Sequence, residues 1–158
     1  MATIRIQHED FNVGAELAAL TAGRADIGGL GCFVGTVRDT AGGRKILAMT
    51  LEHYPGMTER AMSMVAAEAE RRFPILGCTL IHRVGRLLPG ENIVLVAAAS
   101  PHRKAALDAT AFLIDWLKTD APFWKKESFA DGGEAWVEAK AEDEQAAAGW
   151  GRDAKPTT

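Results

Sequence analysis

The chain has 158 residues, 47% of them hydrophobic and 25% charged, so it is long enough for one domain with a core of its own. Its 18 Lys and Arg residues against 21 Asp and Glu residues give a formal net charge of −3. That balance argues against a general nucleic-acid-binding protein, which is normally basic. No apolar signal segment and no stretch of ~20 apolar residues occurs, so we expect a cytoplasmic protein outside the membrane.

The first half of the chain alternates strand and helix patterns. Polar and apolar residues alternate over 3–7 and predict a strand, and helical spacing over 13–21 predicts a helix. Residues 28–37 combine glycines with β-forming residues, which predicts a strand with close backbone contacts. Residues 39–45 contain Gly42 and Gly43, and we expect a mobile loop there. Residues 48–53 are predicted to form the next strand.

The second half has two longer helices. Residues 57–73 are predicted to form a helix that Pro74 ends, followed by strands over 78–84 and 92–99. Residues 100–119 carry the longest helix pattern, and two short strands follow over 124–129 and 135–139. The predicted inner face of the first helix is Met57, Ala61, Met64, Val65 and Ala69, and that of the second is Leu107, Thr110, Ala111, Ile114 and Leu117.

This order of elements predicts a single α+β domain with a mainly antiparallel sheet. The domain is expected over 1–150, with 151–158 as a disordered tail. Cys32 and Cys78 lie in apolar runs without a CxxC pair or metal-ligand spacing, so we expect two reduced, buried thiols and neither metal nor cofactor.

The first candidate site is Ser100-Pro101-His102-Arg103. Ser100 fits an N-cap and Pro101 fits the first helical position, which would place His102 and Arg103 in the first turn. Cations are unfavourable there unless an anion is bound, so the pattern indicates a phosphate site. The alternative is that both side chains point into solvent.

The second candidate is the run from Lys118 to Glu127. Lys118 ends the long helix, where the helix dipole alone would explain a cation. Lys125 and Lys126 are neighbours on an extended segment, so one can enter a pocket while the other meets solvent. Phe123 and Trp124 could form a pocket wall, although aromatic residues more often belong to a core.

The third candidate is Arg38, at the end of the glycine-rich strand, where a guanidinium can clamp a phosphate or remain an ordinary surface group. His53, Tyr54 and His82 are catalytic residue types, but their positions favour structural roles. From the residues alone, we infer a cationic site for a phosphorylated small molecule.

Six runs stand out along the chain, in this order: FVGTVRD, LEHYPGMTE, IHRVG, SPHR, LKTDAPFWKKE and WVEA. From about residue 28 to residue 150, they closely resemble the large subunit of molybdopterin synthase. The resemblance implies an α/β hammerhead-like fold with additional short antiparallel strands. It implies a homodimer within a heterotetramer, in which a small ubiquitin-like subunit carries sulfur as a C-terminal Gly-Gly thiocarboxylate. The implied reaction transfers two sulfurs to cyclic pyranopterin monophosphate (precursor Z) and gives molybdopterin.

The resemblance also assigns residues by position. The two essential lysines of the family fall on Lys118 and Lys125. The substrate-binding positions fall on Thr36, Val37, Arg38, His102, Arg103, Lys125, Lys126, Glu127 and, as the basic residue after WVEA, Lys140. Fixed cations suit this chemistry because they stabilise oxyanionic intermediates. The chain's own cysteines need not supply sulfur.

Two alternatives to an enzyme remain, a non-catalytic binder of a phosphorylated pterin and a scaffold for a ubiquitin-like partner. Neither explains why both lysines are present. His102 and Lys118 are 16 positions apart in one predicted helix, or about 24 Å along its axis. Because a pterin monophosphate cannot touch both ends, we expect a site shared between the two subunits of a dimer.

Overall fold

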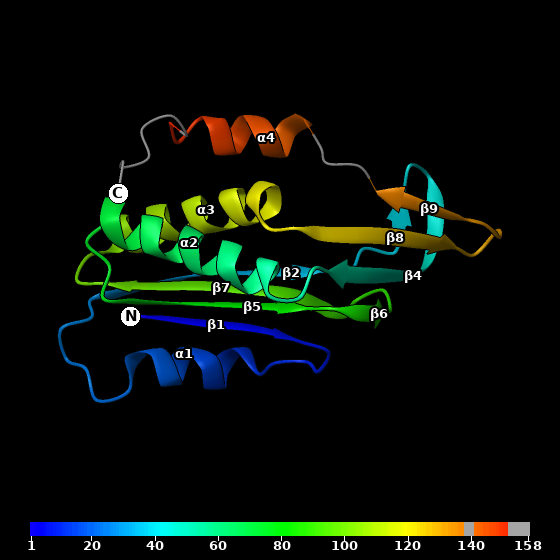
Figure 1. Cartoon of the computed structure of the whole chain (residues 1–158). Coiled ribbons are helices and arrows are strands. Elements are labelled where there is room, and N and C mark those ends of the chain that lie inside the picture. Colours follow the sequence, from blue (N-terminus) through cyan, green and yellow to red (C-terminus); the bar gives the residue numbers. More distant parts are fainter. Residues whose placement is uncertain (138–140, 152–158) are drawn as a thin grey trace.

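The computed structural model describes residues 1–137 and 141–151, and its first layer is a four-stranded sheet in the order β1-β5-β7-β2 (Figure 1). Strand β1 spans Ala2–Gln7, β2 Gly29–Thr36, β5 Gly77–Arg83 and β7 Asn92–Ser100. Only the β1–β5 pairing in this sheet is parallel. All seven residues of β5 are buried, as expected for a strand with both faces covered.

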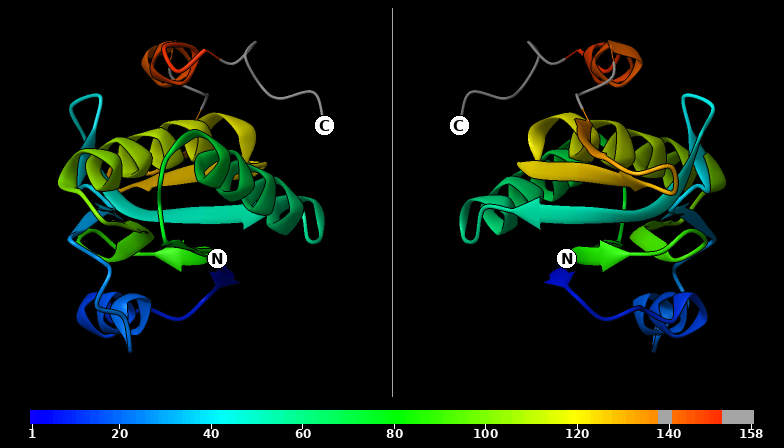
Figure 2. Two further views of the ribbon diagram at one scale, coloured as in Figure 1. Left: turned by 90° about the vertical axis from the view of Figure 1, so that its left-hand side faces the viewer. Right: turned by 90° about the vertical axis from the view of Figure 1, so that its right-hand side faces the viewer.

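Helices cover both faces of this sheet (Figures 1 and 2). Helix α1 (Val13–Thr21) lies on one face, while α2 (Met57–Arg72) and α3 (Arg103–Asp120) lie side by side on the other. The main core forms between the sheet and these two helices, where Met62, Phe112 and Trp116 are almost completely buried. None of the helices in the described part of the chain combines the length and apolarity needed to span a bilayer.

A second, antiparallel sheet extends from one end of the first (Figure 1). It contains β3 (Thr40–Ala41), β4 (Arg44–His53), β8 (Phe123–Phe129) and β9 (Glu134–Val137), in that order, and β6 (Gly85–Leu87) also pairs with β4. The predicted α+β class with a mainly antiparallel sheet is confirmed.

Helix α3 packs very closely against β2 because this strand is rich in glycine. A Cβ atom on Gly31 would lie 2.3 Å from Thr110 Oγ1 and 2.4 Å from the Ala106 carbonyl oxygen. The predicted close backbone contacts of this strand are therefore confirmed, and they set the distance between helix and sheet.

A short helix, α4 (Ala141–Ala148), lies across α3. Trp116 Nε1 donates to the Ala147 carbonyl oxygen over 3.1 Å, and the Trp150 ring meets the Phe112 ring edge to face at 5.7 Å. Arg72 closes this end of the core, with its guanidinium 4.9 Å from the Phe112 ring centre. The tail predicted to be disordered is 151–158, and 152–158 lie outside the described residues. The remaining residue, Gly151, accepts a hydrogen bond from Arg72.

The start of α3 differs from the prediction. Ser100 belongs to β7 and its buried hydroxyl donates to the Pro74 carbonyl oxygen, so it is not the N-cap. His102 is the N-cap, with extended backbone angles, and the helix begins at Arg103. Ser100 is the last residue of the strand because its backbone pairs with Gly29 of β2.

Three further expectations were wrong. Residues 39–45 form a hairpin with β3 and the start of β4, because Gly42 and Gly43 adopt the positive φ angles of a tight turn. Met57, Met64 and Leu107, expected on inner helix faces, are about 60% exposed. Cys32 is exposed rather than buried, because its strand lies at the edge of the sheet.

Candidate active site

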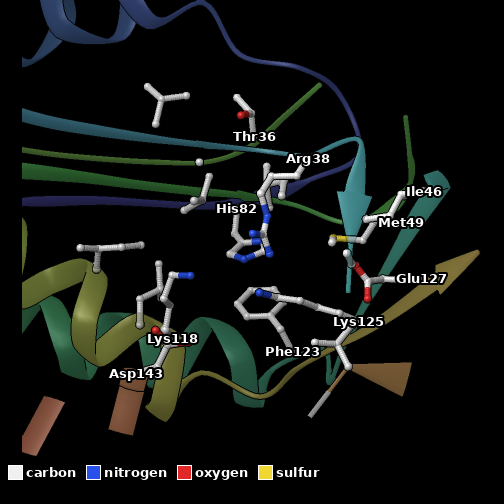
Figure 3. A pocket seen from close by; sticks show the side chains of 18 of the residues that line it. Thr36, Arg38, Ile46, Met49, His82, Lys118, Phe123, Lys125, Glu127 and Asp143 are labelled. Carbon is white, nitrogen blue, oxygen red and sulfur yellow. The ribbon is translucent and has the colours of Figure 1, made fainter. Parts of the chain in front are cut away.

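A cavity of about 770 Å³ lies where the two sheets meet (Figure 3). Its wall is built from the end of β2, the C-terminal turn of α3 and one face of β8. Among the described lining residues are three cations, Arg38, Lys118 and Lys125, and two carboxylates, Glu127 and Asp143. Lys118 and Lys125 are seven positions apart, on consecutive elements, whereas Arg38 is 80 positions before Lys118 and reaches the cavity only through the fold.

Each cation is placed by its local structure. Arg38 follows β2 just after a register shift between Gly35 and Thr36, which turns the chain at the cavity mouth. Lys118 lies in the last turn of α3, where the helix dipole favours a cation. Neither Arg38 nor Lys118 forms an ion pair within the described residues, so both can engage an anionic ligand.

Strand β8 separates the two neighbouring lysines, as the alternation of an extended strand predicts. Lys125 lies opposite Leu51 in the ladder and lines the cavity. Lys126 faces the other side of the sheet, where its ammonium group lies 3.2 Å from Glu134 and 5.6 Å from the centre of the Trp136 ring. The two lysines therefore cannot act on one small molecule in the same cavity.

The remaining candidates divide into two groups. Thr36 and Glu127 line the cavity. Val37 does not, because its side chain is only 3% exposed and packs with Leu51 and Leu87. Its backbone N–H donates to Glu91 and its carbonyl oxygen accepts from Gly90. Lys140 lies outside the described residues.

His102 and Arg103 are exposed at the opposite end of α3 from Lys118, and neither lines the cavity. The helix has 18 residues, which corresponds to about 27 Å along its axis. Within one chain, the structure therefore does not bring the predicted phosphate-binding pair to the lysines.

The sequence interpretation favoured a structural role for His82, but this residue lines the cavity from β5. Its ring is stacked on Phe123, with 3.7 Å between ring centres and 14° between planes. Its Nδ1 lies 2.8 Å from the Arg83 carbonyl oxygen. The only sequence signal was a histidine inside an otherwise apolar strand, which is equally typical of a core position.

Burial lowers the pKa of His82 from its ordinary 6.5 to about 4, because the charged ring would lose its hydration. The hydrogen bond to the Arg83 carbonyl opposes this shift, and electrostatic repulsion, chiefly from Lys125, lowers the pKa of His82 further. At neutral pH, His82 is therefore an uncharged group among cations.

The two thiols lie outside this arrangement, since neither lines the cavity. Burial raises the pKa of Cys78 to about 12, which leaves almost no nucleophilic thiolate at neutral pH. Among residues 1–137 and 141–151, no group of three His, Cys, Asp or Glu side chains could hold a metal ion.

Comparisons with known proteins agree on one family. A family model described as MoaE protein matches residues 6–120. A relative from Mesorhizobium japonicum, named molybdopterin synthase catalytic subunit, is 57% identical over 149 residues, covering 94% of this chain and 92% of its own length.

Two solved structures are similar as well. The molybdopterin biosynthesis MoaE protein from Burkholderia ambifaria is 55% identical, with a TM-score of 0.82 over 96% of this chain and 99% of that chain. A chain in the complex of subunits 1 and 2 of molybdopterin-converting factor from Helicobacter pylori is 21% identical, with a TM-score of 0.67 over 89% of this chain and 90% of that chain. The second likeness shows the fold alone.

Proposed function

This chain belongs to the MoaE protein family, and on that premise we propose that it is the catalytic subunit of a molybdopterin synthase. The reaction converts cyclic pyranopterin monophosphate (precursor Z) to molybdopterin by two sulfur transfers. The sulfur donor is the thiocarboxylated C-terminus of a small ubiquitin-like subunit. The Helicobacter pylori structure is a complex of subunits 1 and 2 of molybdopterin-converting factor. A cytoplasmic location is part of the proposal, and free cysteines suit a reducing compartment.

The observation that carries this proposal is the convergence of Arg38, Lys118 and Lys125 on one cavity. Attack of a thiocarboxylate on the pterin and hydrolysis of the resulting acyl intermediate both develop negative charge on oxygen. Fixed cations in a partly enclosed site stabilise that charge without reorganising. We assign the catalytic roles to Lys118 and Lys125, and substrate binding to Arg38, Thr36 and Glu127.

The other predicted residues receive more limited roles. Val37 holds Thr36 and Arg38 in place through its buried side chain rather than by touching substrate. Lys126 has a structural role on the face of β8 away from the cavity, where it pairs with Glu134 and contacts the Trp136 ring. Lys140 remains a candidate on its sequence position alone.

We further propose that each site is completed by a second copy of the chain. His102 and Arg103 are exposed and lie about 24 Å along α3 from Lys118. In a two-fold dimer the start of one α3 can reach the cavity of the other subunit, where this pair would bind the phosphate. The assembly would then be a homodimer with one small subunit at each end.

The direct test is incubation of the purified chain with precursor Z and a thiocarboxylated small subunit, followed by detection of the dithiolene product. We expect product to form only when all three components are present. Binding of precursor Z without any product, in the presence of an active small subunit, would instead indicate a non-catalytic pterin-binding protein.

A further inference from the structure

Among the described residues that line the cavity, His82 is the one uncharged polar ring, and it lies near three cationic hydrogen-bond donors. Arg38, Lys118 and Lys125 carry only donors at neutral pH. Figure 3 shows the His82 ring pointing into the cavity, between Arg38 and Phe123. The residue is only 6% exposed, so its place in the cavity floor is set by the fold and not by a mobile side chain.

The tautomer of His82 follows from its hydrogen bond. The Arg83 carbonyl oxygen, 2.8 Å from Nδ1, can only accept, so Nδ1 carries the proton and donates it. In the neutral ring, Nε2 is then a bare acceptor. Within the described residues, Nε2 makes no hydrogen bond. It is not fully enclosed either, since the one enclosed polar side-chain atom there that lacks a hydrogen-bond partner is His53 Nδ1. The lone pair of His82 Nε2 is therefore open to the cavity.

Packing fixes the direction of that lone pair. The stack on Phe123 holds the plane of the ring, and the hydrogen bond to the Arg83 carbonyl stops it from flipping. The side chain of Arg83 points to the opposite face of β5, where it donates to the His8 carbonyl oxygen over 2.9 Å. The neighbouring residue thus anchors the backbone that holds the imidazole.

A neutral acceptor serves this cavity better than a third carboxylate. A carboxylate at the position of His82 would pair with Lys118 or Lys125 and occupy its own lone pairs. An uncharged imidazole attracts the ammonium groups less strongly and stays available. Arg38 and Lys118 then stay available for the anionic parts of a ligand, and Nε2 stays available for an N–H group.

We propose that His82 is a substrate-positioning residue whose Nε2 accepts a hydrogen bond from a ring N–H of the bound pterin precursor. This assignment rests on the proposed function, which supplies a reduced pterin with several N–H donors and an anionic phosphate. The hydrogen bond would place the edge of the heterocycle in line with the Nε2 lone pair, in the plane of the imidazole. The reacting carbons would then face Lys118 and Lys125.

The test compares His82→Phe, which keeps a stacking ring but removes the acceptor, with His82→Gln, whose amide oxygen can replace it. We expect His82→Phe to weaken calorimetric binding of precursor Z roughly 5- to 100-fold, since it leaves a ligand donor unpaired. His82→Gln should recover part of that loss. The matched control is His8→Phe, the same substitution outside the cavity, which should bind like the parent.

A second measurement needs no variant. In the parent chain labelled with ¹⁵N-histidine, the Nε2 resonance of His82 should move when precursor Z is added, while that of Nδ1 stays nearly fixed. A purely structural histidine would give no such response. Unchanged binding by a folded His82→Phe chain, or an unmoved Nε2 resonance at saturation, would overturn the assignment. A parent chain that makes no dithiolene would overturn the proposed function, and the assignment would fail with it.

Discussion

Lys118 and Lys125 reach the cavity from a helix end and from a strand, so neither depends on the other for its position. We predict that Lys118→Ala or Lys125→Ala lowers turnover by about 10²–10³, the typical effect of losing one fixed oxyanion partner. The fold should persist because neither side chain belongs to the core. Single-turnover assays with circular dichroism as a check on folding would measure this.

Lys126, the neighbour of Lys125 in β8, offers a control for the two lysine variants. Lys126→Ala removes an identical charge one residue away, on the face of β8 away from the cavity. Its effect on turnover should be much smaller. Parental turnover in both cavity variants would refute the catalytic assignment.

The second prediction concerns His82 and the pH dependence of the free energy of unfolding. Its pKa is about 4 in the folded chain and near 6.5 when unfolded, so between these values the unfolded chain binds a proton that the folded chain does not. Stability therefore falls as the pH drops from about 6.5 to about 4, by an amount on the order of 3 kcal/mol. Urea unfolding across this range should show the loss in the parent and not in His82→Phe. Parallel pH curves for the two chains would contradict the buried neutral histidine.

Strand β2 and helix α3 form the contact on which the position of Lys118 depends. Gly31→Ala would place a Cβ against Thr110 Oγ1 and the Ala106 carbonyl, and the backbone atom cannot move aside without shifting the helix. We expect a loss of about 1–3 kcal/mol in unfolding free energy, as is typical of overpacking. Thermal denaturation would measure the loss.

Gly14→Ala is the matched control for this element. Gly14 is exposed in α1, and its Cβ would meet only Asn12 Oδ1 at 3.5 Å, an ordinary contact. In a helix, alanine is more favourable than glycine by roughly 0.5–1 kcal/mol, so this variant should be no less stable than the parent. A Gly31→Ala chain as stable as Gly14→Ala would show that α3 tolerates displacement.

Periodicity and turn residues predicted most elements because these signals are local. Helix faces were harder, since an apolar stripe does not reveal which part of it another element covers. Leu107 remains exposed, whereas Trp116, outside the predicted face, is buried by α4. The hairpin over 39–45 was missed because a Gly-Gly pair is compatible with both a loop and a tight turn.

The site was only partly predictable, because sequence signals are local and the cavity is formed by tertiary contacts. Arg38, Lys118 and Lys125 were candidates from their sequence positions, each with a structural alternative, and the family resemblance selected the two lysines. His82 was given a structural role, because its place in the cavity depends on Phe123, which lies 41 positions later and reaches it only through tertiary structure. A pattern within one strand cannot report a stack formed between two sheets.

At the scale of the whole molecule, the separation of the two ends of α3 predicts that active sites are shared between subunits. An Arg103→Ala chain and a Lys118→Ala chain should each be inactive alone, because every site lacks one group. In a mixed dimer, one of the two sites contains the intact Arg103 and the intact Lys118. Random exchange in an equal mixture should therefore restore roughly a quarter of parental activity.

The control mixture combines Lys118→Ala with Lys125→Ala. Both residues line the same cavity of one chain, so every site in their mixed dimer lacks a lysine and no activity should return. Subunit exchange would be verified by mass spectrometry of differently tagged chains. If exchange is complete and the Arg103→Ala and Lys118→Ala mixture stays inactive, the two ends of α3 do not serve one shared site. If both mixtures recover activity, the recovery does not come from complementation across the dimer.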